Sequence, residues 1–148
     1  MSVTRSDWLV VVTGRPTPLL SAALTAARRE GQEPEVVPVE AGSWDWLLEA
    51  VNRLATRQIR LVLALDGRSL VGACLANKVR GVRAATVETL DDARRALREL
   101  GANCLFANPQ GKTWFELRQL LRLAAETQAR CPEEIAKVLE ELEGHANR

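Results

Sequence analysis

The 148-residue chain has one histidine, no tyrosine and three cysteines, and these scarcities limit its chemistry. The histidine, His145, stands close to the last residue and is expected to be solvated rather than a ligand or general base. Acid–base chemistry would then fall to carboxylates, lysine, cysteine or a partner chain. The spacing of Cys74, Cys104 and Cys131 fits neither a zinc motif nor a disulfide framework, and it favours a reducing, cytoplasmic setting.

Long apolar runs are also missing. The longest, such as residues 8–12 and 61–65, are far shorter than the roughly 20 residues of a bilayer-spanning helix, so no membrane association is expected. The first residues contain no apolar segment before a cleavage site, so no secretion signal is expected. Twenty basic against nineteen acidic residues give a net charge of +1, which argues against nucleic acid as a partner.

Cofactor and metal motifs are absent as well. No GxGxxG segment follows the first apolar run, and Gly111-Lys112-Thr113 is only the end of a phosphate-binding GxxxxGK(S/T) loop. No cofactor and no metal site are therefore predicted.

The pattern that is present alternates short β-type runs with helical periodicity. Strands are predicted over residues 8–13, 35–39, 59–65, 82–87 and 102–107. Helices are predicted over residues 18–30, 44–57, 69–78, 90–100, 113–126 and 133–143. This alternation predicts a three-layer α/β fold, Rossmann-like (flavodoxin-like), with a five-stranded parallel sheet, helices on both faces and a C-terminal helix. A single domain over residues 1–148 is expected, with the C-terminal helix at about residues 132–144.

Ligands of such sheets bind beyond the carboxyl ends of the strands. Here those loops comprise residues 13–16, 66–72, 87–89 and 107–112. Trp44 and Trp46 flank Asp45 at the start of a predicted helix, so they cannot both face the same core stripe. At least one of the two indoles is expected to be available to a partner or a ring-shaped ligand.

Residues 76–85 read Ala-Asn-Lys-Val-Arg-Gly-Val-Arg-Ala-Ala. This block resembles the ANKv.GiRAA signature of the ribose-5-phosphate isomerase B and galactose-6-phosphate isomerase family. The likeness continues through Ala93-Arg94 and Ala102-Asn103 and covers about residues 59–122. It implies the same five-stranded fold, the interconversion of phosphorylated aldoses and ketoses without a metal, and dimers whose sites borrow residues from the neighbouring chain.

The chain departs from that family's pattern where the chemistry resides. Asp66 stands where the family has a cysteine, and residues 67–72 read Gly-Arg-Ser-Leu-Val-Gly in place of its glycine-rich loop. The family's histidine after the fourth strand falls on Glu88, and its Asp-His pair falls within residues 13–15. Two phosphate-binding arginines near the C-terminus fall on glutamates at positions 133 and 134, which would repel a phosphate.

Two hypotheses follow. The preferred one is a divergent member that lacks the usual isomerase activity and acts as a binding, regulatory or structural subunit. It would form a homodimer or higher oligomer, or a hetero-oligomer with a related subunit. The alternative is an active isomerase in which Asp66 is the base and Glu88 the proton shuttle, although Asp66 serves equally well as a helix cap.

The ligand is expected to be a sugar phosphate or a related small molecule, and a nucleotide or unphosphorylated sugar stays open. The residues predicted to bind it are Arg15, Gly67, Arg68, Ser69, Gly72, Asn77, Asn103 and Lys112.

Overall fold

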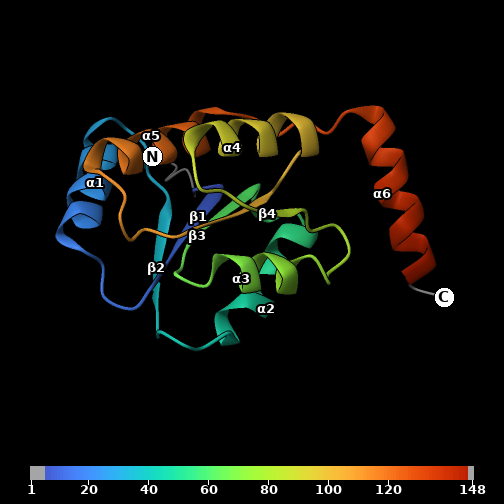
Figure 1. Cartoon of the computed structure of the whole chain (residues 1–148), viewed down its shortest axis with the longest axis horizontal. Coiled ribbons are helices and arrows are strands. Elements are labelled where there is room, and N and C mark those ends of the chain that lie inside the picture. The colour runs from blue at the N-terminus through green and yellow to red at the C-terminus, as the bar shows by residue number, and fades with distance from the viewer. Residues whose placement is uncertain (1–5, 147–148) are drawn as a thin grey trace, which may run out of the picture.

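The computed structural model describes residues 6–146, with side chains as far as residue 144, so the expectation for His145 lies outside the described side chains. Five strands form one parallel sheet in the order β2-β1-β3-β5-β4 (Figure 1). They are β1 (Trp8–Thr13), β2 (Glu35–Val39), β3 (Leu61–Leu65), β4 (Ala84–Thr86) and β5 (Cys104–Ala107). The helices are α1 (Pro18–Arg29), α2 (Asp45–Ala55), α3 (Ser69–Ala76), α4 (Leu90–Arg95), α5 (Trp114–Glu126) and α6 (Glu133–Ala146), with a π-helical turn, η1 (Ala96–Leu100), continuing α4.

The predicted fold class is confirmed. Each predicted strand and helix is present, and the sheet carries helices on both faces. The order of the last two strands is the detail that differs. A flavodoxin sheet runs 2-1-3-4-5, whereas here β5 lies between β3 and β4, and β4 is the edge strand.

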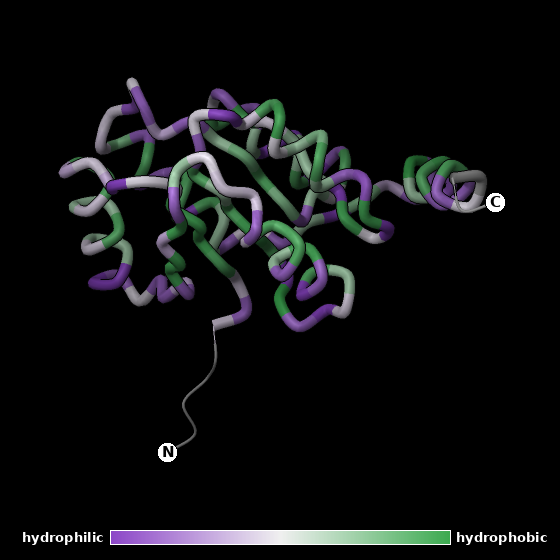
Figure 2. The backbone as a smooth tube through the Cα atoms, turned by 90° about the horizontal axis from the view of Figure 1, so that it is seen from below, coloured by the Kyte–Doolittle hydropathy of each residue, from purple (hydrophilic) through white to green (hydrophobic). Residues whose placement is uncertain are grey.

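Two apolar cores lie on opposite faces of the sheet, because successive side chains of a strand point to opposite sides. Val10 and Val12 of β1 face the core under α1, α4 and α5, whereas Leu9 and Val11 face the core under α2 and α3. The hydropathy tube shows hydrophobic segments through the middle of the molecule and hydrophilic ones in the outer turns (Figure 2). Since β3 is covered on both faces, its sequence is a continuous apolar run rather than an alternating one.

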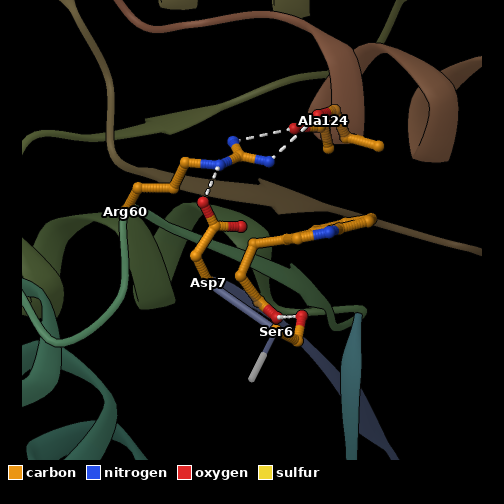
Figure 3. Close-up of polar contacts among 6 residues, drawn as sticks. Ser6, Asp7, Arg60 and Ala124 are labelled. Atoms are coloured by element: carbon orange, nitrogen blue, oxygen red, sulfur yellow. Dashed lines mark hydrogen bonds and ion pairs between the residues drawn. The ribbon is translucent and has the colours of Figure 1, made fainter. Parts of the chain in front are cut away.

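Arg60, which precedes β3, links the amino edge of the sheet to the end of α5 (Figure 3). Its Nη1 and Nη2 atoms donate to the carbonyls of Ala124 and Ala125 at the end of α5, each at 3.0 Å. Its Nε atom donates to Asp7 Oδ2 at 3.1 Å. One guanidinium therefore satisfies two carbonyls that the helix end leaves without intrahelical partners.

The last helix, α6, stands apart from the sheet and the helices that cover it (Figures 1 and 2). Its apolar stripe is exposed, with Ile135 at 37%, Val138 at 52% and Leu142 at 60%. The segment before it is held by a hydrogen bond from the Arg130 amide to the Leu97 carbonyl. Within residues 6–146, no helix is both long and apolar enough to cross a bilayer.

Candidate functional site

The carboxyl ends of all five strands meet at one edge of the sheet, as parallel pairing requires. Of the residues predicted to act on a ligand, this edge holds Arg15 after β1, the segment 66–69 after β3, Glu88 after β4 and Lys112 after β5. Asp66 and Arg68 are the two whose side chains are in contact with one another, and they form the centre of the candidate site.

Asp66 is buried at the mouth of β3, with only 3% of its surface exposed. Its amide donates to the Ala107 carbonyl, which extends the pairing of β3 with β5 by one residue. Its Oδ1 atom accepts the Arg68 amide at 2.7 Å, a turn that leads into α3. Its Oδ2 atom is buried and has no hydrogen-bond partner among the residues that the structure describes.

Arg68 is the cation that pairs with this carboxylate. Its Nε atom is 3.9 Å from Asp66 Oδ1, and its side chain is 42% exposed. The guanidinium carbon lies over the indole of Trp44, 4.3 Å from the ring centroid, which is a cation–π contact. Arg68 therefore connects a buried carboxylate to an aromatic face.

The aromatic side of the site comes from the start of α2. The Trp44 and Trp46 rings are 6.1 Å apart, and Trp46 lies 6.3 Å from Phe106 of β5. Trp46 Nε1 donates to the Ser43 carbonyl at 3.2 Å. Both indoles are half-buried against the core under α2 and α3. The expectation that at least one of them is freely available is therefore not met, and the face of Trp44 is covered by Arg68.

Sequence reasoning missed the pairing of Trp44 with Arg68. The two residues belong to loops after β2 and β3, and these strands are separated in the sheet by β1. No local spacing in the sequence links them, so only the assembled sheet edge brings them together.

Glu88 and Lys112 lie elsewhere along the edge. The Lys112 ammonium donates to the Asn108 carbonyl at 2.7 Å, and both Lys112 and Glu88 line a small cavity together with Glu116. Glu88 also borders an open hollow of about 560 Å³ next to Leu70. Asp66 lines neither of these two cavities, so the two predicted catalytic carboxylates do not share one.

The pKa of Asp92, in the first turn of α4, is shifted by the backbone of the loop after β4. Asp92 Oδ2 accepts the amides of Glu88 and Thr89 at 3.1 and 3.3 Å. These two backbone hydrogen bonds, the Glu88 one first, lower the pKa of Asp92 from its usual value. The Asp92 carboxylate therefore fixes the loop after β4 to the first turn of α4.

Three of the predicted ligand-binding residues have structural partners instead. Asn77 and Asn103 lie at the amino edge, away from Asp66. Asn77 exchanges hydrogen bonds with both the amide and the carbonyl of Ala84, and Asn103 accepts the Arg83 amide. Gly72 faces the ring of Phe106 at the interface of α3 with β5.

The remaining predicted residues, Arg15, Gly67 and Ser69, stay at the carboxyl edge. Gly67 has open space around its Cα, and the Ser69 carbonyl accepts the hydroxyl of Thr86 at 3.2 Å. Arg15 is exposed. Among the described side chains, no cluster of three or more histidine, cysteine, aspartate or glutamate residues could hold a metal ion.

Solved structures share this fold. The type B ribose 5-phosphate isomerase of Trypanosoma brucei aligns with a TM-score of 0.69 and 18% identity over 95% of this chain and 99% of that one. The ribose-5-phosphate isomerase B of Mycoplasma genitalium, solved with bound ribulose-5-phosphate, aligns with a TM-score of 0.71 and 15% identity over 97% and 99%. That of Thermotoga maritima gives 0.67 and 19% over 92% and 99%.

No protein-family model matches the chain, and no curated protein matches it. The resemblance expected from residues 76–85 is thus confirmed for the fold, which is that of the type B ribose 5-phosphate isomerases.

Proposed function

We propose that the protein is a non-catalytic relative of the type B isomerases, a subunit that binds a small ligand at the carboxyl edge without isomerising it. The observation that carries the proposal is that Asp66 is paired with Arg68 and lines neither of the two cavities that Glu88, the predicted proton shuttle, lines. A general base must lie within hydrogen-bond reach of the proton that it removes. The Asp66 carboxylate is instead buried, paired with Arg68, and hydrogen-bonded to the Arg68 amide in the turn that leads into α3.

The cations at this edge support the same proposal. A sugar phosphate needs free guanidinium or ammonium donors for its dianion. Of the three cations predicted to bind the ligand at this edge, Lys112 bonds to a carbonyl of its own loop and Arg68 is engaged by Trp44 and Asp66, whereas Arg15 is exposed. Glu133 and Glu134, which stand where the family has arginines, are exposed at the start of α6.

The alternative is an active isomerase in which Asp66 is the base and Glu88 carries the proton. The unpartnered Oδ2 atom of Asp66 favours it, because a carboxylate oxygen without a donor is free to accept a proton. This alternative requires Glu88 to approach Asp66, although Asp66 lines neither of the two cavities that Glu88 lines.

An isomerase assay with ribose 5-phosphate and allose 6-phosphate separates the two, with Asp66→Asn as the matched variant. We expect the wild-type protein to give no turnover above the Asp66→Asn background. Turnover that disappears in Asp66→Asn would overturn the proposal and establish the carboxylate base. Glu88→Gln, an exposed change, then tests the proton shuttle in the same assay.

The partner in this proposal is a second copy of the chain, bound through α6. The helix presents Ile135, Val138 and Leu142 to solvent, and α3 presents Leu70 and Val71 in the same way. Two exposed apolar surfaces on one chain, with α6 standing away from the sheet, are suited to pairing between copies (Figure 1). A related subunit in place of the second copy is the other outcome of the test given below.

A cytoplasmic location is part of the same proposal. Cys74, Cys104 and Cys131 are all free thiols, and Cys74 is exposed. A reducing compartment preserves such thiols.

A further inference from the structure

We propose that the ligand of this edge is a neutral, hydroxyl-rich ring, a sugar without phosphate, which displaces Arg68 from Trp44 and donates a hydroxyl to Asp66. This inference rests on the proposed binding function and specifies the chemical class of the ligand. It concerns three side chains that the structure already places in contact.

The first argument is the unsatisfied oxygen. Asp66 Oδ2 is buried, and it accepts no hydrogen bond from the residues that the structure describes. A buried polar atom without a partner destabilises the fold unless a donor reaches it. A ligand hydroxyl supplies such a donor, and a phosphate group, whose dianion carries only acceptor oxygens, cannot take its place at this oxygen.

The second argument is the aromatic face. The plane of Trp44 carries the guanidinium of Arg68, which is partly exposed, so a displaced guanidinium would enter solvent rather than the core. An indole presents an apolar, electron-rich face to whatever covers it. The C–H bonds of a sugar ring fit this face, and the hydroxyls at the ring edge remain available to Asp66.

The third argument is charge. Asp66 sits at the centre of the site, and the cation paired with it, Arg68, is also the group that the ligand would displace, whereas Arg15 and Lys112 lie elsewhere along the edge. Once Arg68 has left, the carboxylate stands without its ion partner and repels an anion. A neutral ring has no such repulsion, so the site selects against the phosphorylated form of the same sugar.

The test is a titration of nitrogen-15-labelled protein with D-allose, D-ribose and ribose 5-phosphate, followed by NMR. The chain has four tryptophans, and Trp44→Phe identifies the indole signal of Trp44. We expect the two unphosphorylated sugars to move that signal, and ribose 5-phosphate to bind at least tenfold more weakly than ribose.

Three variants place the ligand. Arg68→Ala removes the competing cation and is expected to tighten sugar binding about threefold, the range of an exposed cation–π contact. Asp66→Asn replaces the acceptor with an amide and is expected to weaken it about tenfold. Arg29→Ala, an exposed arginine on α1, should leave the affinity unchanged.

Each other outcome overturns a separate statement. Tighter binding of ribose 5-phosphate than of ribose, or sugar binding that Arg68→Ala weakens, overturns the neutral ligand and leaves a binding subunit in place. The absence of any shift at Trp44 also overturns it. Isomerase turnover overturns the proposed function itself. Should Asp66→Asn fail to fold, the affinity of Arg68→Ala and the shift of the Trp44 signal in the wild-type protein still decide the matter.

Discussion

The Cα atom of Gly72 faces the aromatic ring of Phe106 so closely that a Cβ atom at this position would overlap the ring. Helix α3 can therefore approach β5 only because residue 72 has no side chain. The contact holds α3, and with it the turn of Asp66 and Arg68, against the sheet.

Replacing this glycine is expected to destabilise the protein. Gly72→Ala should lower the free energy of unfolding by about 1–3 kcal/mol, because the methyl group displaces Phe106 or the helix. This loss opposes the gain of up to about 1 kcal/mol that alanine usually brings to a helix interior. Urea denaturation measures it, with Gly67→Ala as the control, since nothing lies within 4 Å of that position. Equal stability of the two variants would contradict the close approach.

Arg60 is expected to contribute to stability through its bonds to the end of α5. Arg60→Met keeps the aliphatic stem and removes both charge-assisted hydrogen bonds to the Ala124 and Ala125 carbonyls. We expect a loss of about 1–3 kcal/mol in the free energy of unfolding. Asp7→Asn should cost less than about 1 kcal/mol, because Asp7 is an exposed partner. A larger loss for Asp7→Asn than for Arg60→Met would contradict this ranking.

The sequence predicted the strands well where they are apolar and less well at their ends. Residues 82–87 were predicted as one strand, yet β4 contains only Ala84–Thr86. The side chain of Asn103 accepts a hydrogen bond from the Arg83 amide. The side chain of Asn77 bonds to both the amide and the carbonyl of Ala84. The hydropathy of a sequence does not reveal that an asparagine side chain forms the backbone hydrogen bonds that a neighbouring strand would otherwise form.

The candidate site was predicted in part for a similar reason. Parallel strands bring their following loops to one edge, so Asp66, Arg68, Glu88 and Lys112 could be assigned there from topology alone. Which of them touch one another depends on side-chain directions across non-adjacent loops. That information appears only when Trp44 and Arg68 are placed together by the sheet.

Glu30 is expected to make stability depend on pH in the acid range. Its carboxylate pairs with Arg122 and with the buried Arg118, at 2.9 and 2.6 Å. The hydrogen bond from Arg122 first, then that from Arg118, lowers the pKa of Glu30 below its usual 4.5. A lowered pKa in the folded state stabilises the fold above the unfolded-state value, and this stabilisation is lost as the pH falls through the folded-state value.

Urea denaturation from neutral pH to about pH 3 tests this expectation. Wild-type protein should lose stability below about pH 4.5, the ordinary value for Glu30, more steeply than Glu30→Gln, and the two curves should converge at the acid end. Glu133→Gln, an exposed change on α6, should follow the wild-type curve. Parallel curves for wild type and Glu30→Gln would show that Glu30 does not titrate differently in the folded state.

The exposed stripe of α6 leads to a prediction about assembly. If α6 binds a second copy, the wild-type protein should sediment at about twice its 16.3 kDa chain mass. Val138→Glu and Leu142→Glu replace side chains that are exposed within one chain, so each variant should still fold. Each places a charge where an apolar side chain would be buried between copies, and should raise the dissociation constant at least tenfold, or about 1.4 kcal/mol.

Sedimentation at several concentrations, together with circular dichroism, distinguishes loss of assembly from loss of folding. Glu141→Gln changes an exposed residue outside the apolar stripe and should leave the dimer intact. A wild-type chain that stays monomeric at every concentration would contradict self-association. If that monomer then forms a stoichiometric complex with a purified related subunit, and Val138→Glu abolishes the complex, the same helix face binds a different partner. Dimers that survive both Val138→Glu and Leu142→Glu would place the interface elsewhere, because two buried carboxylates facing their copies cannot be accommodated in an apolar contact without loss of affinity.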